Sequence, residues 1–168
     1  MKLLIVESPG KIKKLQDILG AEWRVAASCG HVRDLPNQGY GLEPPDYTLR
    51  YAETRPDVLK KLAALAREAE EVFLASDPDR EGEAISWHLK DALGLSTYKR
   101  VTYTAITAQD VRAGLDTPRD IDMNLVHAQE ARRALDRLCG YKVSGPLGQA
   151  VREEKMSAGR VQSPAVRI

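Results

Sequence analysis

The sequence predicts an α/β protein with a mostly parallel sheet flanked by helices, followed by a mainly α-helical partial domain. Two observations predict the sheet: short, continuous apolar runs recur through residues 1–105, and segments with helical spacing lie between them. Such runs are typical of strands buried on both faces, and their alternation with helices is typical of parallel sheets. A third observation predicts the helical part, because the alternation ends near Thr117 and Pro118.

The apolar pattern assigns each element of the first part. Predicted strands lie at residues 3–6, 23–28, 47–51, 72–75 and 101–103. The first predicted helix follows Ser8-Pro9-Gly10 and ends at Gly20, and a second starts at Pro56. A third follows Asp77–Glu83, with Ile85, His88 and Leu89 on its inner face. Residues 30–48, with three glycines and three prolines, are predicted to form a long surface loop.

The last third of the chain has one long helical pattern at residues 124–138, with leucines on its apolar side. We therefore predict two domains, at residues 1–117 and 118–168. The second has no complete core pattern of its own. We expect it to expose apolar surface that other parts of a larger protein would cover.

Charge and composition exclude several classes of protein. Lys and Arg number 25 against 24 for Asp and Glu, so net charge alone does not attract nucleic acid. No apolar run approaches the roughly 20 residues of a membrane helix, and the N-terminus is too short in apolar residues for a secretory signal. Cys29 and Cys139 are far apart and outside any CxxC pair, which argues against zinc and disulfides and favours a cytoplasmic location.

An acidic cluster follows the predicted strand at residues 72–75. Asp77, Asp79 and Glu81 alternate with other residues, and in an extended chain such positions share one face. Glu7 ends the first strand in the same way, so a fourth carboxylate joins them if the two strands are neighbours. Carboxylates alone, without Cys or His, favour Mg²⁺. The alternative, which the residues leave open, is that these acids only cap a helix.

Basic residues follow the same strands. Lys11 lies four residues after Glu7 at a helix start, where backbone N–H groups and an ammonium can hold a phosphate. Arg80 lies inside the acidic cluster and can neutralise carboxylates or contact a phosphate. His31 and Arg33 follow the second strand and are expected at the same edge of the sheet. A solvated helix lysine and a structural histidine remain the alternatives.

Polar side chains also recur in the last third. They lie at helical spacing opposite the leucines and in the small-residue segment that follows: Gln129, Arg132, Arg133, Asp136, Ser157, Arg160 and Gln162. Arg, Gln and Ser are the residue types that contact phosphates and base edges. A solvated helix face is the alternative interpretation.

Five motifs together resemble one family. They occur in the order Ile5–Lys11 (IVESPGK), Gly30–Pro36 (GHVRDLP), Asp77–Glu83 (DPDREGE), Ala128–Arg133 (AQEARR) and Ser157–Ser163 (SAGRVQS). This set is similar to the bacterial DNA topoisomerase I family, type IA, over essentially the whole chain. The resemblance implies a Toprim domain followed by the first segment of a discontinuous DNA-binding domain.

The resemblance implies a role for each motif. The family relaxes negatively supercoiled DNA by transient single-strand cleavage and religation. By this resemblance Glu7 assists proton transfer beside the scissile phosphate, Lys11 stabilises that phosphate and protonates the leaving oxygen, and Mg²⁺ is the cofactor. Arg80, from its place in the acidic cluster, is a third catalytic candidate. The expected metal ligands are Asp77, Asp79, Glu81 and Glu7. The expected contacts with single-stranded DNA are His31, Gln129, Arg132, Arg133, Asp136, Ser157, Arg160 and Gln162.

One departure limits the expected activity of this chain. The family's nucleophilic tyrosine lies in a later domain, and none of the six tyrosines here is in that motif. We therefore expect the chain to need the remaining domains of the enzyme and to be inactive alone. Two alternatives are a free-standing Mg²⁺-dependent Toprim nuclease and a non-catalytic module that binds single strands. No membrane partner is expected.

Overall fold

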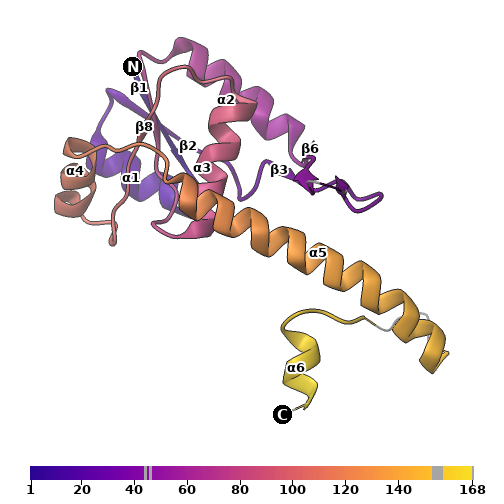
Figure 1. Ribbon diagram of the computed structural model, residues 1–168. Coiled ribbons are helices and arrows are strands. Elements are labelled where there is room, and N and C mark those ends of the chain that lie inside the picture. Colours follow the sequence, from indigo (N-terminus) through magenta and orange to yellow (C-terminus); the bar gives the residue numbers. More distant parts are fainter. Residues whose placement is uncertain (44, 46, 153–156, 168) are drawn as a thin grey trace. The chain divides into compact units, whose positions relative to one another are not determined.

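The protein contains a parallel sheet, as the sequence predicts, and this sheet has four strands. The strand predicted at residues 47–51 is not among them, because Thr48–Leu49 pairs with Leu42–Glu43 in a separate sheet. The computed structural model describes residues 1–43, 45, 47–152 and 157–167 (Figure 1). The strands are β1 (Lys2–Val6), β2 (Trp23–Ala27), β7 (Glu71–Leu74) and β8 (Lys99–Arg100). Their spatial order is β2-β1-β7-β8, and every neighbouring pair is parallel. The α/β class is therefore confirmed, and the strands that end at Val6 and Leu74 are direct neighbours.

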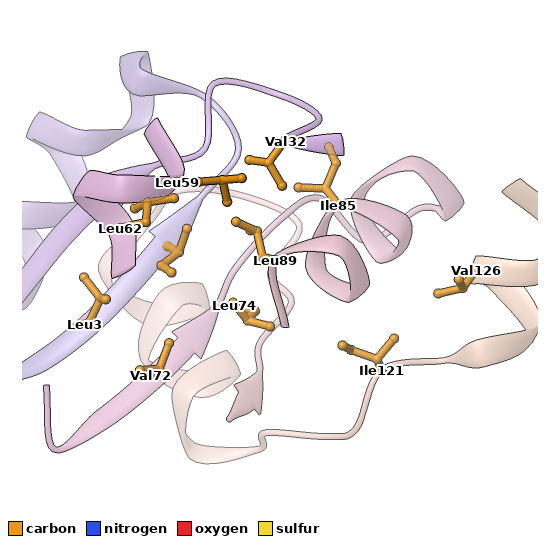
Figure 2. Close-up of a cluster of buried hydrophobic side chains, with 11 residues drawn as sticks. Leu3, Val32, Leu59, Leu62, Val72, Leu74, Ile85, Leu89, Ile121 and Val126 are labelled. Atoms are coloured by element: carbon orange, nitrogen blue, oxygen red, sulfur yellow. The ribbon is translucent and has the colours of Figure 1, made fainter. Parts of the chain in front are cut away.

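Helices cover both faces of this sheet. The apolar residues Leu3, Ile5 and Leu74 pack with α2 (Pro56–Glu68) and α3 (Arg80–Ala92) on one face (Figure 2). Side chains of the opposite parity, such as Leu4 and Val6, pack with α1 (Ile12–Leu19) and α4 (Ala108–Asp116) on the other. Alternate residues of β1 thus enter different clusters, which is why its sequence is apolar without interruption.

The predicted boundaries of the first two helices agree closely with the structure, whereas the last predicted helix is much longer than expected. α1 ends where Gly20 takes a φ of 81°, a conformation that residues with a Cβ rarely adopt. Pro56 is the first residue of α2. The long helix α5 spans Met123–Val151, beyond the predicted end at residue 138 and through Pro146. A short α6 (Gln162–Arg167) follows.

Two predictions about strands and loops need correction. The strand predicted at residues 101–103 lies at Lys99–Arg100. The prediction relied on apolar residues to mark buried strand positions, whereas this strand buries an arginine. The predicted surface loop at residues 30–48 buries Val32, Leu35 and Leu42. It also contains β3 (Arg33–Asp34), β4 (Leu42–Glu43) and β5 (Thr48–Leu49), with β6 (Ala52–Glu53) just beyond it; β4 and β5 are antiparallel. A single-turn helix, η1 (Pro9–Lys11), precedes α1.

The chain divides into two compact units. Unit 1 comprises residues 1–34 and 53–127, and unit 2 comprises residues 35–52 and 128–168. The predicted domain boundary near residue 117 stays a prediction, since compact units and evolutionary domains need not coincide. Large apolar side chains are exposed mainly in the last third, including Leu135, Tyr141, Val143, Val151, Val161 and Val166. Within the described residues, no helix has the length and apolar character needed to cross a membrane.

Candidate functional site

The first strand ends at an acidic residue followed by a capped turn. Glu7 follows β1, and the Ser8 hydroxyl accepts a hydrogen bond from the Gly10 amide at 3.3 Å. The turn delivers Lys11 to the start of α1, where its ammonium forms an ion pair with the Asp77 carboxylate. Lys11 is thus directed at the acidic cluster, and a freely solvated lysine is not what the structure shows.

A short segment after β7 leads to the N-cap of α3. Asp79 is the N-cap residue of α3, and its Oδ1 accepts a hydrogen bond from the Gly82 amide at 2.8 Å. Gly82 lies so close to Asp77 that a Cβ at this position would overlap the Asp77 carbonyl oxygen. The first turn of α3 therefore packs directly against the backbone of Asp77. One oxygen of Asp79 caps the helix, as the alternative interpretation expects, and the other is not used by that cap.

Asp77, Asp79 and Glu81 do not all lie in an extended segment, contrary to the prediction from their alternating spacing. Asp79 is extended, with φ −135° and ψ 177°, but α3 begins at Arg80, so Glu81 lies in the first helical turn. The prediction that the three carboxylates share one face of an extended segment is therefore wrong. Glu81 instead lies 3.3 Å from the Nε2 atom of His31 through its Oε2 atom. Arg80 is exposed at the first residue of α3.

Glu7 lies within electrostatic range of the other acids. Partial burial and the charges of Asp77 and Asp79 raise the pKa of Glu7, while Lys11 and His31 oppose that shift. A raised pKa means that repulsion and lost hydration outweigh the nearby cations. We call the group formed by Glu7, Asp77, Asp79 and Glu81, with Lys11 and His31, the acidic edge. The sequence predicts that Glu7 meets Asp77, Asp79 and Glu81 at one rim of the sheet, with Lys11 close by. The structure has Asp77 and Asp79 near enough to act on Glu7 and pairs Lys11 with Asp77.

The donor set of the acidic edge suits a hard cation. Carboxylate oxygens are the ligands that Mg²⁺ prefers, and the unfavourable ionisation of Glu7 is what a cation would relieve. Among the described residues, however, no three acidic, His or Cys side chains are grouped closely enough to hold a metal ion. The ligand chemistry therefore fits, whereas the assignment of individual ligands stays a prediction.

A buried tyrosine hydroxyl lies near this edge. The Tyr103 hydroxyl is buried and has no hydrogen-bond partner within the described part of the chain. Burial, with a contribution from the Asp77 charge, raises its pKa to about 12. Tyr103 is therefore protonated at neutral pH and is poorly suited to act as a nucleophile.

Arg33 does not reach the acidic edge with His31, contrary to the sequence expectation. Its Nε donates to Nδ1 of His88 at 3.2 Å, its guanidinium pairs with Asp91, and it lies 5.4 Å from the Trp87 ring. Burial, together with Arg33, lowers the pKa of His88 to about 3, so this histidine is a neutral acceptor. These contacts attach the Gly30–Pro36 motif to α3. His31 is then placed beside Glu81.

Unit 2 contains a cavity of about 660 Å³ beside α5. We call it the α5 cavity. Its lining is Arg133, Asp136, Arg137, Gly140, Tyr141, Ser144, Gly145, Ser157, Ala158 and Gln162. Four of the predicted DNA contacts are in this set, and Arg160 joins it by donating to Asp136 at 2.7 Å. Residues 133–145 of α5 and residues 157–162 are thus brought together around one hollow.

The remaining predicted contacts on α5 lie beside the cavity lining. Gln129 is 7% exposed, so it is a buried polar residue and is not on an open surface. Arg132 lies 3.8 Å from Asp136. Sequence reasoning missed Arg137 and Tyr141, which contact one another at 3.1 Å. The signal was available, because these residues continue the four-residue spacing from Gln129 and Arg133 by two further turns.

Comparisons with known proteins give matches over both parts of the chain. The Toprim domain family matches residues 2–106, and the DNA topoisomerase family matches residues 120–168. A DNA topoisomerase I, described as plasmid, from Xylella fastidiosa is 56% identical over 170 residues, which cover 100% of this chain and 26% of that protein. Full-length topoisomerase I from Thermotoga maritima has a similar structure, with a TM-score of 0.82 and 41% identity. That match covers 87% of this chain and 26% of the Thermotoga chain.

These matches place the fold in a known class: the chain belongs to the Toprim family, whose match spans more than half of it. The topoisomerase match that follows, and both relatives, confirm the resemblance to bacterial DNA topoisomerase I. The chain spans about a quarter of the length of these two relatives.

Proposed function

We propose that this chain is the N-terminal part of a type IA DNA topoisomerase, which relaxes negatively supercoiled DNA by transient single-strand cleavage and religation. The observation that supports this most is the acidic edge itself. Glu7 and Asp77 follow the neighbouring parallel strands β1 and β7, and Lys11, in the turn after Glu7, pairs with Asp77 at the carboxyl end of the sheet. In open α/β sheets this end is where ligands bind.

In this proposal Glu7 and Lys11 act directly at the scissile phosphate. Burial and the charge of Asp77 raise the pKa of Glu7, which favours its protonated form and suits a carboxyl group that exchanges a proton with the substrate. Lys11 pairs with Asp77 in the free protein, and a bound phosphate would compete for its ammonium. Arg80, exposed at the start of α3, supplies a second cation for the phosphate.

Asp77 and Asp79, with Glu81 and Glu7, are the residues proposed to hold Mg²⁺. When bound, the ion would neutralise charge on the DNA phosphate and on the carboxylates. His31 contacts Glu81, and we propose that it orients this carboxylate and contacts DNA.

The α5 cavity is proposed to receive a segment of single-stranded DNA. Cationic and hydrogen-bonding side chains with an aromatic ring are the combination that binds single strands through backbone contacts and stacking. The proposed contacts are Gln129, Arg132, Arg133, Asp136, Ser157, Arg160 and Gln162, to which the cavity lining adds Arg137 and Tyr141.

The partners proposed for the chain are single-stranded and negatively supercoiled DNA and the remaining domains of the enzyme. Those domains supply the nucleophilic tyrosine, which none of the six tyrosines here replaces. Such a protein works on chromosomal or plasmid DNA in the cytoplasm.

A labelled single strand tests the proposal. The 168-residue chain is incubated with end-labelled single-stranded DNA and Mg²⁺, and binding and products are measured together. We expect binding that weakens with salt and no cleavage. Hydrolysed ends would support the nuclease alternative. The non-catalytic module would be supported by two results together: the chain has no measurable affinity for Mg²⁺, and its DNA binding is unchanged by the double substitution Asp77→Ala and Asp79→Ala.

A further inference from the structure

A fully buried arginine holds the backbone from which Asp77 projects. Arg100, the last residue of β8, is 0% exposed. Its Nη1 atom donates to the carbonyl oxygens of Leu74 at 3.2 Å and Ser76 at 2.8 Å, and its Nη2 atom to that of Asp77 at 2.9 Å. Leu74 is the last residue of β7, and Ser76 and Asp77 lie in the segment that leaves the sheet after it. One side chain therefore donates to three backbone carbonyls where the acidic cluster begins, and of these the Leu74 carbonyl also accepts from the Val101 amide.

Glu83 balances the charge of this arginine. Its Oε2 atom accepts from Nε and Nη2 of Arg100 at 3.2 and 3.0 Å, and the carboxylate also accepts from Arg119 at 2.8 and 2.9 Å. The Asp122 amide donates to it at 2.9 Å. Burial would raise the pKa of Glu83, but these hydrogen bonds outweigh it and hold the pKa below its usual range. Glu83 is thus the fourth acid of the Asp77–Glu83 motif and already has its full set of partners.

Stability alone does not explain an arginine in this place. A buried ion pair is often no more stabilising than apolar side chains of similar volume. An apolar residue at position 100 would, however, leave the carbonyls of Ser76 and Asp77 without donors in a site closed to water. Lysine has the charge but only a single nitrogen, which cannot reach three carbonyls and Glu83 together.

The other side of the same segment is closed by α3. Gly82 approaches the Asp77 carbonyl so closely that no side chain fits between them. Arg100 and the start of α3 therefore hold the Asp77 backbone from two directions. Its carboxylate remains directed to Lys11.

We propose that Arg100 is a positioning residue: it sets the backbone of residues 75–77 so that the Asp77 carboxylate is oriented for a divalent cation before one binds. This inference rests on the proposed function. It goes beyond that function in assigning a role to a residue that touches neither DNA nor metal.

Two matched variants of the 168-residue chain test the inference. Arg100→Lys keeps the charge beside Glu83 but cannot keep the hydrogen bonds to the Leu74, Ser76 and Asp77 carbonyls together. Arg119→Lys changes the other guanidinium on the same carboxylate and leaves those carbonyl bonds intact. Mn²⁺ affinity is measured by electron paramagnetic resonance, and stability by urea unfolding. We expect Arg100→Lys to weaken Mn²⁺ binding at least tenfold and Arg119→Lys to change it less than twofold. Equal losses in both variants, or none in Arg100→Lys, would overturn the inference.

Backbone order parameters from ¹⁵N relaxation give a second readout without metal. We expect values of about 0.85 for residues 75–77 in the unsubstituted chain and below about 0.6 in Arg100→Lys, with β1 unchanged. If Arg100→Lys does not fold, low values in the unsubstituted chain overturn the inference and high values support it. If the unsubstituted chain binds no Mn²⁺, the metal assignment fails, and the order parameters alone then decide whether Arg100 positions this segment.

Discussion

The acidic edge in unit 1 and the α5 cavity in unit 2 hold their polar side chains in different ways. At the acidic edge, buried groups such as Arg100 and Glu83 determine where the backbone of the exposed carboxylates lies. In the α5 cavity, the side chains proposed to contact DNA are partly exposed and pair with one another, as Arg160 does with Asp136. The two proposed tasks differ in how rigidly the side chains must be held. A cation needs ligands placed to within fractions of an ångström, whereas a flexible single strand tolerates adaptable contacts.

The largest effect is expected from removing the buried carboxylate. Glu83→Ala leaves Arg100 buried without a counter-charge and the Asp122 amide without an acceptor. We expect a loss of about 3–5 kcal/mol in the free energy of unfolding. Urea unfolding at neutral pH measures it. Asp136→Ala is the control in the α5 cavity, and a similar loss there would remove the contrast between the two regions.

The close approach of α3 to the Asp77 backbone gives the second prediction. Gly82→Ala forces that backbone to shift, and we expect a loss near 3 kcal/mol, the upper part of the range for overpacking. Gly140→Ala, in α5, meets nothing within 4 Å, and we expect a gain of roughly 0.5–1 kcal/mol from helix propensity. Thermal or urea unfolding of both variants measures these changes in the free energy of unfolding. A neutral Gly82→Ala would mean that this helix start is not held tightly.

The third prediction concerns the pH dependence of stability. The pKa of His88 is about 3 in the folded protein and near 6.5 when unfolded. Below pH 6.5 the unfolded chain therefore binds a proton that the folded chain does not, so stability falls as pH falls. Relative to His88→Gln, the unsubstituted chain should lose about 2 kcal/mol between pH 7 and pH 5. Parallel pH profiles for the two proteins would show that His88 is not the neutral acceptor of Arg33.

The smallest effect is expected in the α5 cavity. Arg133→Ala should leave the stability of the chain unchanged and weaken binding of single-stranded DNA. If Arg133 contacts one phosphate, the slope of log K against log salt should fall by about 0.7. Fluorescence anisotropy over a salt series measures the slope. An unchanged slope with unchanged affinity would remove Arg133 from the proposed DNA path.

The fold class could be predicted from the sequence alone because it depends on patterns among residues that are close together in the sequence. The uninterrupted apolar run at Leu3–Val6 and the stop at Gly20 follow from local backbone geometry, so they could be read without partners. The same holds for Glu7 and Asp77, because parallel strands bring their carboxyl ends to one edge whatever their sequence separation. The positions of these two acids, each just after an apolar strand, were therefore enough to indicate the acidic edge.

Only the tertiary structure decided where the other polar side chains point. Glu81 turned toward His31 because α3 begins one residue after Asp79, and Arg33 turned toward His88. The burial of Arg100 could not be predicted, since its carbonyl partners come from the end of β7, far away in sequence. The physical reason is that a charged side chain is stable in a core only when distant groups supply all its hydrogen bonds, and no local pattern records which groups those are.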